Sequence, residues 1–353
     1  MPDFKNILLI QLGDIGDVVL TTPTIRAIKE TYPESRVSIL VRKPFGCLLL
    51  ADPRLYEVVE TGRALGSVFR VLQEFIQFTR RLRRARYDLV IDLRTGDRGA
   101  ILSFLTKAPT RIGRNVMDKK FWRGLAYTEF VSDPQPNLLS NHPGADQSLH
   151  VVREIGITTT DSTPRLSVMP ADHECALELL ARLSLTADSR WVSINPCSRW
   201  KYKELEYEKW GAVIDQLWKT HQLPAVLVGS PEDAAVCQEI VAGREERAFN
   251  LAGETTLGEL TAVLRLSSIH IGVDSAPPHI AAAVGTPTLT IFGPSNWRGW
   301  IIPDDLHRIV TSDLPCVPCG QKGCENTERS RCLYELGVDE ILRQTLELWR
   351  KIE

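Results

Sequence analysis

Short apolar runs alternate with helix-like segments along the chain, and this alternation restricts the fold more than any other feature. In the first half the runs are typical of strands at Asn6–Leu12, Arg36–Val41, Tyr56–Glu60 and Asp88–Leu93, and a helix is expected over Asp17–Thr31 after the first of them. In the second half they return at Trp191–Asn195, Pro224–Gly229, Ile269–Val273 and Thr288–Phe292. Strands that alternate with helices of this length predict βαβ units and parallel sheets.

A polar, proline-containing segment at Ile157–Asp172 separates the two series and predicts a linker. The 353 residues are enough for two domains of ordinary size. We therefore expect two α/β domains, over residues 1–165 and 166–353, with a ligand cleft between them and ligand groups at the carboxyl ends of the strands. The last helix-like segment, Val338–Lys351, could pack on either domain.

Composition excludes several classes of protein. A net charge of −2 argues against a nucleic-acid-binding protein, because such domains are usually basic. The first apolar run, Ile7–Ile10, has only four residues and does not resemble a signal peptide. No uncharged apolar run is long enough to span a bilayer. We therefore expect a cytoplasmic protein, with attachment to a membrane surface left open.

The segment from Val273 to Ser295, VDSAPPHIAAAVGTPTLTIFGPS, points to a phosphorylated ligand. A strand ends at Asp274-Ser275, two prolines follow, and a helix of small residues is expected over His279–Val284. A helix start offers free backbone N–H groups and the positive end of the helix dipole, which suit a phosphate. His279 could donate a hydrogen bond to a diphosphate, although a histidine satisfied in the core is the alternative.

The loop after the first strand carries Gly13, Asp14, Gly16 and Asp17. It matches neither the dinucleotide-binding nor the P-loop pattern. Two carboxylates would repel a phosphate but could accept a proton or bind hydroxyl groups. Equally, Asp14 could cap the turn while Asp17 complements the dipole of the next helix.

Two further clusters follow strands of the second half. Ser198–Lys203 (SRWKYK) combines cations, a hydroxyl and aromatic rings, so it could form an anion pocket or a solvated charged loop. In Gly229–Asp233 the acids Glu232 and Asp233 could cap a helix or bind ribose hydroxyls.

Four cysteines and five arginines form two more groups. The cysteines, Cys316, Cys319, Cys324 and Cys332, begin with a CxxC pair, and their alternatives are a structural zinc site, free thiols or a local disulfide. The arginines, in one helical stretch, are Arg80, Arg81, Arg83, Arg84 and Arg86. They could be a solvated helix face or could contact an acidic substrate or an anionic membrane.

Together these clusters resemble glycosyltransferase family 9, the ADP-heptose:lipopolysaccharide heptosyltransferases, over nearly the whole chain. The resemblance is carried by GDIGDVVLTTP at Gly13–Pro23, SRWKYK at Ser198–Lys203, DSAPPHIAAA at Asp274–Ala283 and FGPS at Phe292–Ser295. It is strongest with the branch called heptosyltransferase III. It implies a GT-B fold of two Rossmann-like domains facing a central cleft, with the acceptor in the N-terminal domain and the nucleotide sugar in the C-terminal domain.

The resemblance also implies a reaction: inverting transfer of heptose from ADP-L-glycero-D-manno-heptose to the lipopolysaccharide inner core, with no cofactor or catalytic metal. The partners would be the donor, the core acceptor and the surface of the inner membrane. A nucleotide-sugar epimerase and a non-catalytic nucleotide-sugar-binding protein are the alternatives.

Site residues carry over by motif position. The family's catalytic aspartate corresponds to Asp17 and its phosphate-binding lysine to Lys203, while Gly13, Asp14 and Gly16 lie in the acceptor-side loop. The resemblance assigns to donor binding Ser198, Arg199, either Glu232 or Asp233, and Asp274, Ser275, Ala276 and His279. Ser198-Arg199 replaces the Thr-Thr pair of some members, and Ala276 replaces a glycine found in others.

Overall fold

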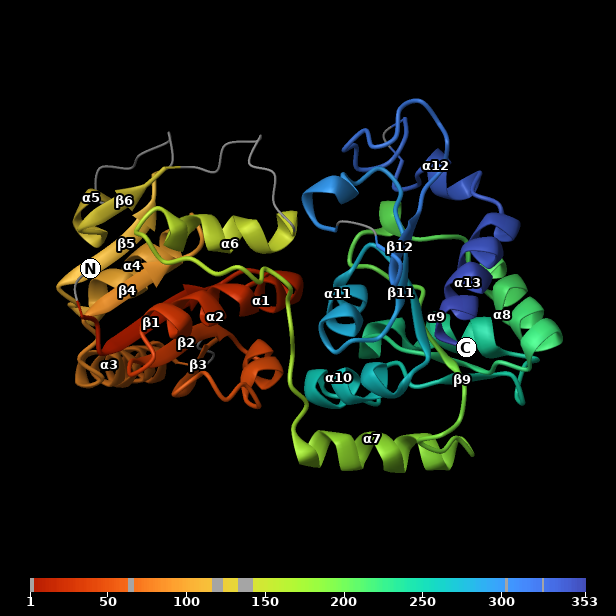
Figure 1. The fold of residues 1–353 in the computed structure, drawn as a ribbon, viewed down its shortest axis with the longest axis horizontal. Coiled ribbons are helices and arrows are strands. Elements are labelled where there is room, and N and C mark those ends of the chain that lie inside the picture. The colour runs from red at the N-terminus through yellow and green to blue at the C-terminus, as the bar shows by residue number, and fades with distance from the viewer. Residues whose placement is uncertain (1–2, 63–66, 116–122, 133–141, 302–303, 326) are drawn as a thin grey trace. The chain divides into compact units, whose positions relative to one another are not determined.

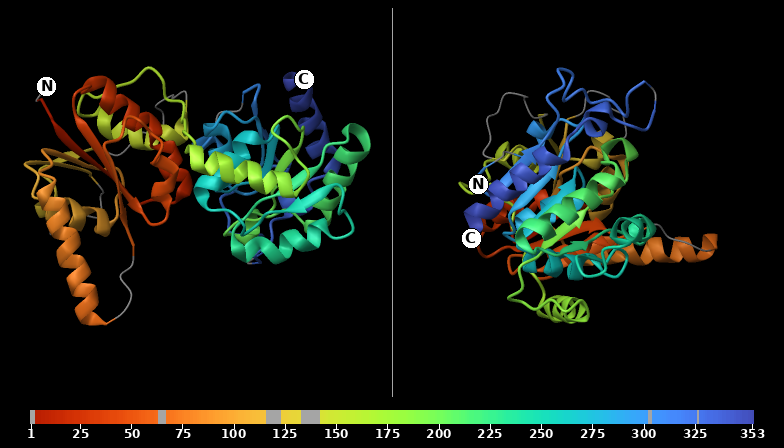
Figure 2. Two further views of the ribbon diagram at one scale, coloured as in Figure 1. Left: turned by 90° about the horizontal axis from the view of Figure 1, so that it is seen from below. Right: turned by 90° about the vertical axis from the view of Figure 1, so that its right-hand side faces the viewer.

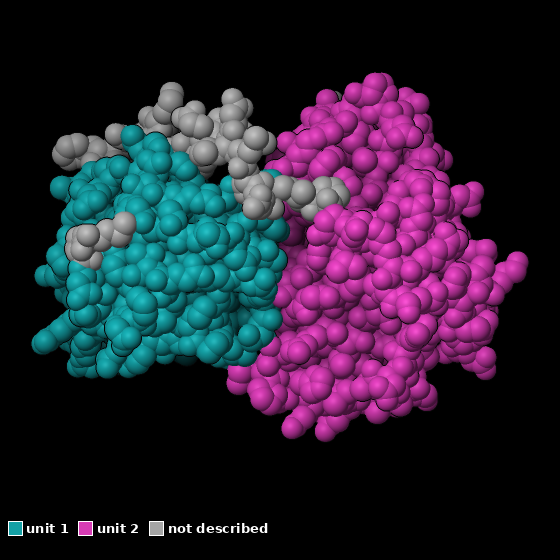
Figure 3. Space-filling model, in the orientation of Figure 1, with its two compact units in different colours: residues 1–167 teal, residues 168–353 magenta. Residues whose placement is uncertain are grey.

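The computed structural model describes residues 3–62, 67–115, 123–132, 142–301, 304–325 and 327–353. The chain divides into two compact units, Met1–Ser167 and Val168–Glu353 (Figures 1 and 3). Each unit is built around its own parallel sheet, as the alternating pattern predicts.

Unit 1 has a six-stranded parallel sheet in the order β3-β2-β1-β4-β5-β6. Its strands are β1 (Asn6–Gln11), β2 (Arg36–Arg42), β3 (Glu57–Thr61), β4 (Leu89–Asp92), β5 (Thr110–Arg114) and β6 (Glu129–Val131). Its α-helices are α1 (Ile15–Leu20), α2 (Thr22–Thr31), α3 (Val68–Arg84), α4 (Asp97–Thr106), α5 (Arg123–Ala126) and α6 (Pro143–Arg153). A short 3₁₀ helix, η1, covers Phe45–Leu49.

The helices of unit 1 form two layers. The connections through α3, α4 and α5 run along the sheet in one direction, and right-handed crossovers place these helices on one face. The connection from β1 to β2 runs the other way, so α1 and α2 lie on the opposite face, where α6 packs against both. Helices on both faces explain why Ile7–Ile10 of β1 are completely buried.

The helix expected over Asp17–Thr31 is in fact two helices, α1 and α2, separated at Thr21. Pro23 has no N–H to donate to the carbonyl of Val19, so a continuous helix would lose a hydrogen bond there. Instead, the hydroxyl of Thr22 donates to the Val19 carbonyl at 2.9 Å, and that of Thr21 donates to the Asp17 carbonyl at 2.8 Å.

Unit 2 repeats the sheet order as β12-β11-β10-β7-β8-β9. Its strands are β7 (Val192–Asn195), β8 (Ala225–Leu227), β9 (Ala248–Asn250), β10 (Ile269–Val273), β11 (Thr288–Ile291) and β12 (His307–Val310). Its α-helices are α7 (Pro170–Arg182), α8 (Tyr207–His221), α9 (Ala234–Val241), α10 (Leu257–Leu266), α11 (Ala276–Ala283), α12 (Arg331–Tyr334) and α13 (Val338–Ile352). Short 3₁₀ helices are η2 (Lys201–Lys203), η3 (Pro231–Asp233) and η4 (Trp297–Gly299).

Helix α13 packs against α8 and β12 within unit 2. Helix α11 begins at Ala276, three residues before the expected start at His279, because Pro277 and Pro278 fall in its first turn, where no backbone N–H is needed. None of the helices in the described ranges is both long and apolar enough to cross a bilayer.

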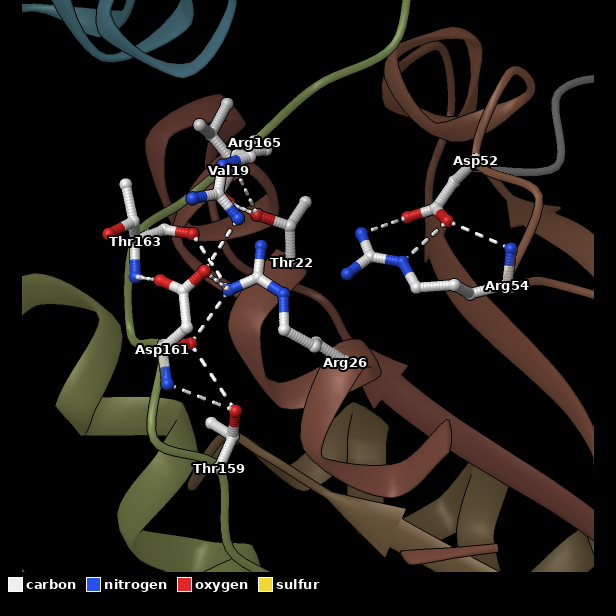
Figure 4. Close-up of polar contacts among 9 residues, drawn as sticks. All are labelled: Val19, Thr22, Arg26, Asp52, Arg54, Thr159, Asp161, Thr163 and Arg165. Atoms are coloured by element: carbon white, nitrogen blue, oxygen red, sulfur yellow. Dashed lines mark hydrogen bonds and ion pairs between the residues drawn. The ribbon is translucent and has the colours of Figure 1, made fainter. Parts of the chain in front are cut away.

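The last segment of unit 1 is fastened to α2 (Figure 4). A guanidinium nitrogen of Arg26 donates to the Asp161 carbonyl at 2.7 Å, and the backbone N–H of Arg165 donates to the Thr22 hydroxyl at 3.1 Å. Burial alone would raise the pKa of the Asp161 carboxyl, but hydrogen bonds from Thr163 and Arg165 and the charge of Arg26 lower it to about 2. Residues 161–165 therefore belong structurally to unit 1.

Candidate active site

The strand order places a crevice at one point of each sheet. In unit 1, β1 and β4 are neighbours, with Ile10 paired to Asp92, but the helices that follow them lie on opposite faces. In unit 2, β7 and β10 stand in the same relation, with Asn195 paired to Gly272. Ligands of open parallel sheets bind beyond the carboxyl ends of two such strands. The loops after β1 and β4 are therefore the candidate site of unit 1, and the loops after β7 and β10 are the candidate site of unit 2.

The loop after β1 holds Asp17 in a defined position. The Asp17 carboxylate accepts a hydrogen bond from the backbone N–H of Asp14 at 2.9 Å, and the Gln11 side chain accepts one from the N–H of Gly13 at 3.0 Å. A Cβ atom on residue 13 would lie 2.2 Å from an Asp17 carboxylate oxygen, so only glycine fits there. Gly16 is the second residue of α1. Asp14 is thus the N-cap residue of α1, and Asp17 completes a capping box with it; the Asp17 side chain is 14% exposed.

Arg94 contacts the other oxygen of Asp17. A guanidinium nitrogen of Arg94, two residues beyond β4, donates to Asp17 Oδ1 at 2.9 Å. Arg42, the last residue of β2, forms an ion pair with Asp14. Neither arginine was predicted as a site residue from the sequence. Each arginine directly follows a strand that was predicted from the sequence. Because β2, β1 and β4 are neighbours in the sheet, the position of the arginines after these strands could have indicated that they lie near Asp14 and Asp17.

A buried acid lies behind Arg94. Asp92 is completely buried and accepts hydrogen bonds from the Tyr127 hydroxyl at 2.5 Å and from the Arg94 backbone N–H at 3.0 Å. Burial raises the pKa of Asp92 to about 7, although both hydrogen bonds favour the carboxylate. A Cβ atom on Gly99 would lie 2.2 Å from a carboxylate oxygen of Asp92, so α4 can pack here only because residue 99 is glycine.

In unit 2, the loop after β7 meets the loop after β10. The Lys203 ammonium lies 2.7 Å from a carboxylate oxygen of Asp274, and the two side chains are 20% and 12% exposed. The Ser198 hydroxyl donates to the Asp274 carbonyl at 3.4 Å, and the Ser198 N–H donates to Glu204 at 2.9 Å. The structure therefore joins three predicted donor-site residues through contacts that the sequence could not show.

The start of α11 lies next to this ion pair. Ser275 is the N-cap residue and Ala276 is the first residue of the helix. The Ser275 hydroxyl donates to the side-chain oxygen of Asn195 at 2.6 Å, and the Asn195 amide donates to the Val228 carbonyl at 3.2 Å. Asn195, which the sequence analysis did not select, thus ties β7 and the segment after β8 to the N-terminus of α11.

Two predicted residues have aromatic neighbours. The His279 ring is half-buried, with its centroid 6.4 Å from that of Trp300. The Arg199 guanidinium lies over the Trp200 ring, 5.1 Å from its centroid. His279 is therefore not a fully buried core histidine, and Arg199 is exposed in the Ser198–Lys203 loop.

The two acids after β8 differ in their contacts. Asp233 accepts hydrogen bonds from the Ser230 N–H at 2.8 Å and from the Ser230 hydroxyl at 2.9 Å, so it caps η3. Glu232 is exposed, and the Ser230 hydroxyl and its own backbone N–H lower the pKa of its carboxyl. Glu232 is therefore the acid more available to a ligand.

The clustered cysteines line one pocket of about 320 Å³ and are free thiols, so none is in a disulfide. Within the described ranges, no three histidine, cysteine or acidic side chains are placed to bind a metal ion together. The structure therefore does not support the zinc alternative for this cluster.

The architecture matches glycosyltransferases of the GT-B fold. The crystal structure of the family 9 glycosyltransferase from Veillonella parvula DSM 2008 matches with a TM-score of 0.83 at 21% identity, covering 99% of this chain and 98% of that one. Escherichia coli heptosyltransferase WaaC with ADP-2-deoxy-2-fluoro heptose matches with a TM-score of 0.72 at 16% identity, covering 97% and 99%. Two parallel-sheet units with the same strand order thus define the GT-B fold.

Sequence comparison identifies the family. Residues 75–329 match the profile of glycosyltransferase family 9 (heptosyltransferase). Lipopolysaccharide heptosyltransferase 3 of E. coli is 29% identical over 293 residues, which are 81% of this chain and 83% of that protein. The chain therefore belongs to glycosyltransferase family 9, the heptosyltransferases.

Proposed function

We propose that this enzyme transfers heptose from ADP-L-glycero-D-manno-heptose to the lipopolysaccharide inner core, with inversion at the anomeric carbon, and that it belongs to the heptosyltransferase III branch. The 29% identity to E. coli lipopolysaccharide heptosyltransferase 3 supports the branch. Family membership favours transfer over the epimerase and non-catalytic alternatives. We place the enzyme in the cytoplasm, peripheral to the inner membrane, since its acceptor would be lipid-borne.

The observation that carries the proposal is the setting of Asp17. Its carboxylate lies beyond the carboxyl end of β1, where the helices after β1 and β4 leave on opposite faces of the sheet. It is held from two sides, by the N–H of Asp14 and the guanidinium of Arg94. Each carboxylate oxygen has more than one lone pair, so Asp17 can still accept a hydrogen bond from an acceptor hydroxyl. In this role Asp17 takes the hydroxyl proton as the oxygen attacks the anomeric carbon.

Unit 2 supplies the groups for the donor. As the bond to the anomeric carbon breaks, negative charge grows on the ADP diphosphate. The Lys203 ammonium, Arg199 and the N–H groups at the start of α11 stabilise that charge, with Ser198, Ser275 and His279 as hydrogen-bonding groups. Asp274 holds Lys203 in place at 2.7 Å. Glu232 binds the ribose hydroxyls, since Asp233 is occupied in the cap.

Asp17→Asn tests the assignment of the base. The amide keeps the shape of the side chain but cannot take a proton, so kcat should fall about a hundredfold to ten-thousandfold. Binding of ADP, measured by calorimetry, should stay close to that of the unchanged enzyme because its groups lie in unit 2. Transfer is measured by the mass of heptose-deficient core lipopolysaccharide after incubation with ADP-heptose.

The matched control is Glu57→Gln, which also converts an arginine-paired carboxylate of unit 1 to an amide. Glu57 pairs with Arg81 at the start of β3, whereas the site lies at the carboxyl ends of the strands. It should leave transfer unchanged. Turnover retained by Asp17→Asn would remove Asp17 from the role of base.

A further inference from the structure

Helix α3 leaves an apolar face uncovered. Five large apolar side chains in its first half are exposed, Val68 at 87%, Phe69 at 78%, Leu72 at 54%, Phe75 at 48% and Ile76 at 39%. Their spacing places them on one side of the helix. Large apolar side chains gathered in this way on a protein surface mark a site of interaction.

The same side of the helix is buried further along. Thr79 and Leu82 continue the stripe and are 8% and 1% exposed, because the second half of α3 packs on its own unit. The part before Thr79, Val68–Phe78, corresponds to about 16 Å of helix. Figure 2, left, shows α3 (orange) extending away from the sheet of its unit. The exposed apolar side chains thus continue the stripe by which α3 packs on its own unit, along the part of the helix that projects beyond it.

The remaining surface of α3 is strongly cationic. The helix contains five arginines and one acid, Glu74, although the whole chain has a net charge of −2. Arg70 pairs with Glu74, and Arg81 pairs with Glu57. Arg80 and Arg84 are exposed and make no ion pair or side-chain hydrogen bond to any part of the chain that the structure describes. These two charges are available to an external anion.

We propose that α3 docks unit 1 on an anionic phospholipid bilayer, with Phe69, Leu72 and Phe75 inserted among the acyl chains and Arg80 and Arg84 on lipid phosphates. A helix with aromatic and aliphatic side chains on one face and arginines on the other is suited to lie in the membrane interface. Guanidinium groups bind phosphate oxygens in pairs. A second copy of the chain at this face would offer these arginines no surplus of acids, since α3 itself has only one.

The fold links this surface to the candidate site. A helix between parallel strands runs antiparallel to them, so the projecting start of α3 lies toward the carboxyl ends of the strands. Asp17 and Arg94 lie at those same ends. Docking through α3 would therefore turn the proposed acceptor edge of unit 1 toward the lipid surface. The usefulness of this arrangement rests on the proposed lipid-borne acceptor, but its test does not.

The test is co-sedimentation of the full chain with two kinds of vesicle, pure phosphatidylcholine and equal parts of phosphatidylcholine and phosphatidylglycerol. We expect binding to the anionic vesicles that weakens as salt is raised, and little binding to the neutral ones. The vesicles contain neither acceptor nor ADP-heptose, so the result is independent of the proposed transfer.

Two variants separate the contributions. Replacing Phe69 and Phe75 together by serine should weaken binding to anionic vesicles at least about tenfold. Replacing Arg80 and Arg84 together by glutamine should weaken it about fivefold for each arginine. All four side chains are exposed, so the fold should persist, as circular dichroism would verify.

The matched controls lie in unit 2. Lys219→Gln with Arg350→Gln removes the same charge from exposed positions, and Leu306→Ser removes an exposed apolar side chain; both should bind like the unchanged protein. Undiminished binding by both α3 variants would overturn the proposal, as would equal binding to neutral vesicles. A dimer in light scattering that dissociates on the Phe69/Phe75 change would also overturn it, since a second copy would then cover the face.

Discussion

Asp92 shows how a single buried residue can carry both structure and a pH dependence. It lies at the end of β4, next to β1, and binds Tyr127 and the backbone of Arg94, whose side chain reaches Asp17. A rigid anchor at Asp92 therefore helps to hold the partner of the proposed base. The strand that contains Asp92 was predicted from the sequence. The burial of Asp92 was not, because it results from the packing of α4 and Tyr127 against it.

The raised pKa of Asp92 predicts that unit 1 loses stability as pH rises. The pKa is about 7 in the folded unit and 3.8 as the ordinary value, so between these values the fold retains a proton that the unfolded chain releases. The favourable contribution is complete below the unfolded pKa and is lost as pH rises through about 7. Asp92→Asn does not titrate, so its thermal unfolding should lack this component.

The measurement is the unfolding temperature of both proteins between pH 5 and pH 8, values chosen on either side of the folded pKa of about 7. The unchanged protein should lose more stability over this range than Asp92→Asn. Parallel curves for the two proteins would show that Asp92 does not titrate in this range.

Contacts with neighbouring residues, rather than its own sequence pattern, hold the segment Ser198–Lys203 in one conformation. Glu204 accepts the Ser198 N–H and the Lys201 ammonium, while Asp274 pairs with Lys203. From sequence alone, an anion pocket and a solvated loop were both open. Lys203 forms its ion pair with Asp274, in the loop after β10, whereas Lys201 pairs with Glu204. The two lysines therefore differ in their surroundings.

We predict different effects for these two lysines. Lys203→Ala should weaken ADP binding and lower kcat/KM about tenfold to hundredfold, because a charged hydrogen-bond donor to the diphosphate is lost. Lys201→Ala removes the same charge two residues away and should have a much smaller effect. Calorimetry with ADP and transfer kinetics check both variants. Equal losses would indicate that the loop acts through its total charge rather than through Lys203.

Strands that form buried apolar runs were predictable even when short, as β8 shows, whereas half-exposed strands such as β9 and β12 were missed. The strand at Ile269–Val273 was predicted with its observed bounds, because it is an apolar run that ends in Asp-Ser. The strands β9 and β12 lie at the edges of their sheet, have 3 and 4 residues and were not predicted. Such strands depend on a neighbouring strand rather than on a pattern of their own.

At the scale of the whole molecule, the proposed reaction needs no metal ion. In the proposal, Lys203, Arg199 and the start of α11 stabilise the negative charge on the diphosphate, which a divalent cation would otherwise neutralise. Transfer should therefore proceed at the same rate in excess EDTA as in added magnesium. The measurement is the initial rate of ADP release under both conditions. A strict requirement for magnesium would contradict this assignment of the charge.

The sequence by itself determined the class of fold and supplied most of the proposed site residues. Alternation of strands and helices is local information, and so are motifs such as SRWKYK and DSAPPH, which led to the family and to Asp17, Lys203 and His279. Both kinds of signal lie within short windows of the chain, because they reflect hydrophobic periodicity and turn chemistry.

Only the tertiary structure decided which polar groups meet. Arg94 lies 77 positions from Asp17, and Asn195 lies 80 positions from Ser275, so no local pattern could pair them. The split of one expected helix at Thr21, the burial of Asp92 and the uncovered half of α3 were decided in the same way. Each depends on what packs beside the residue, which the order of strands in the sheet sets and a single stretch of sequence does not contain.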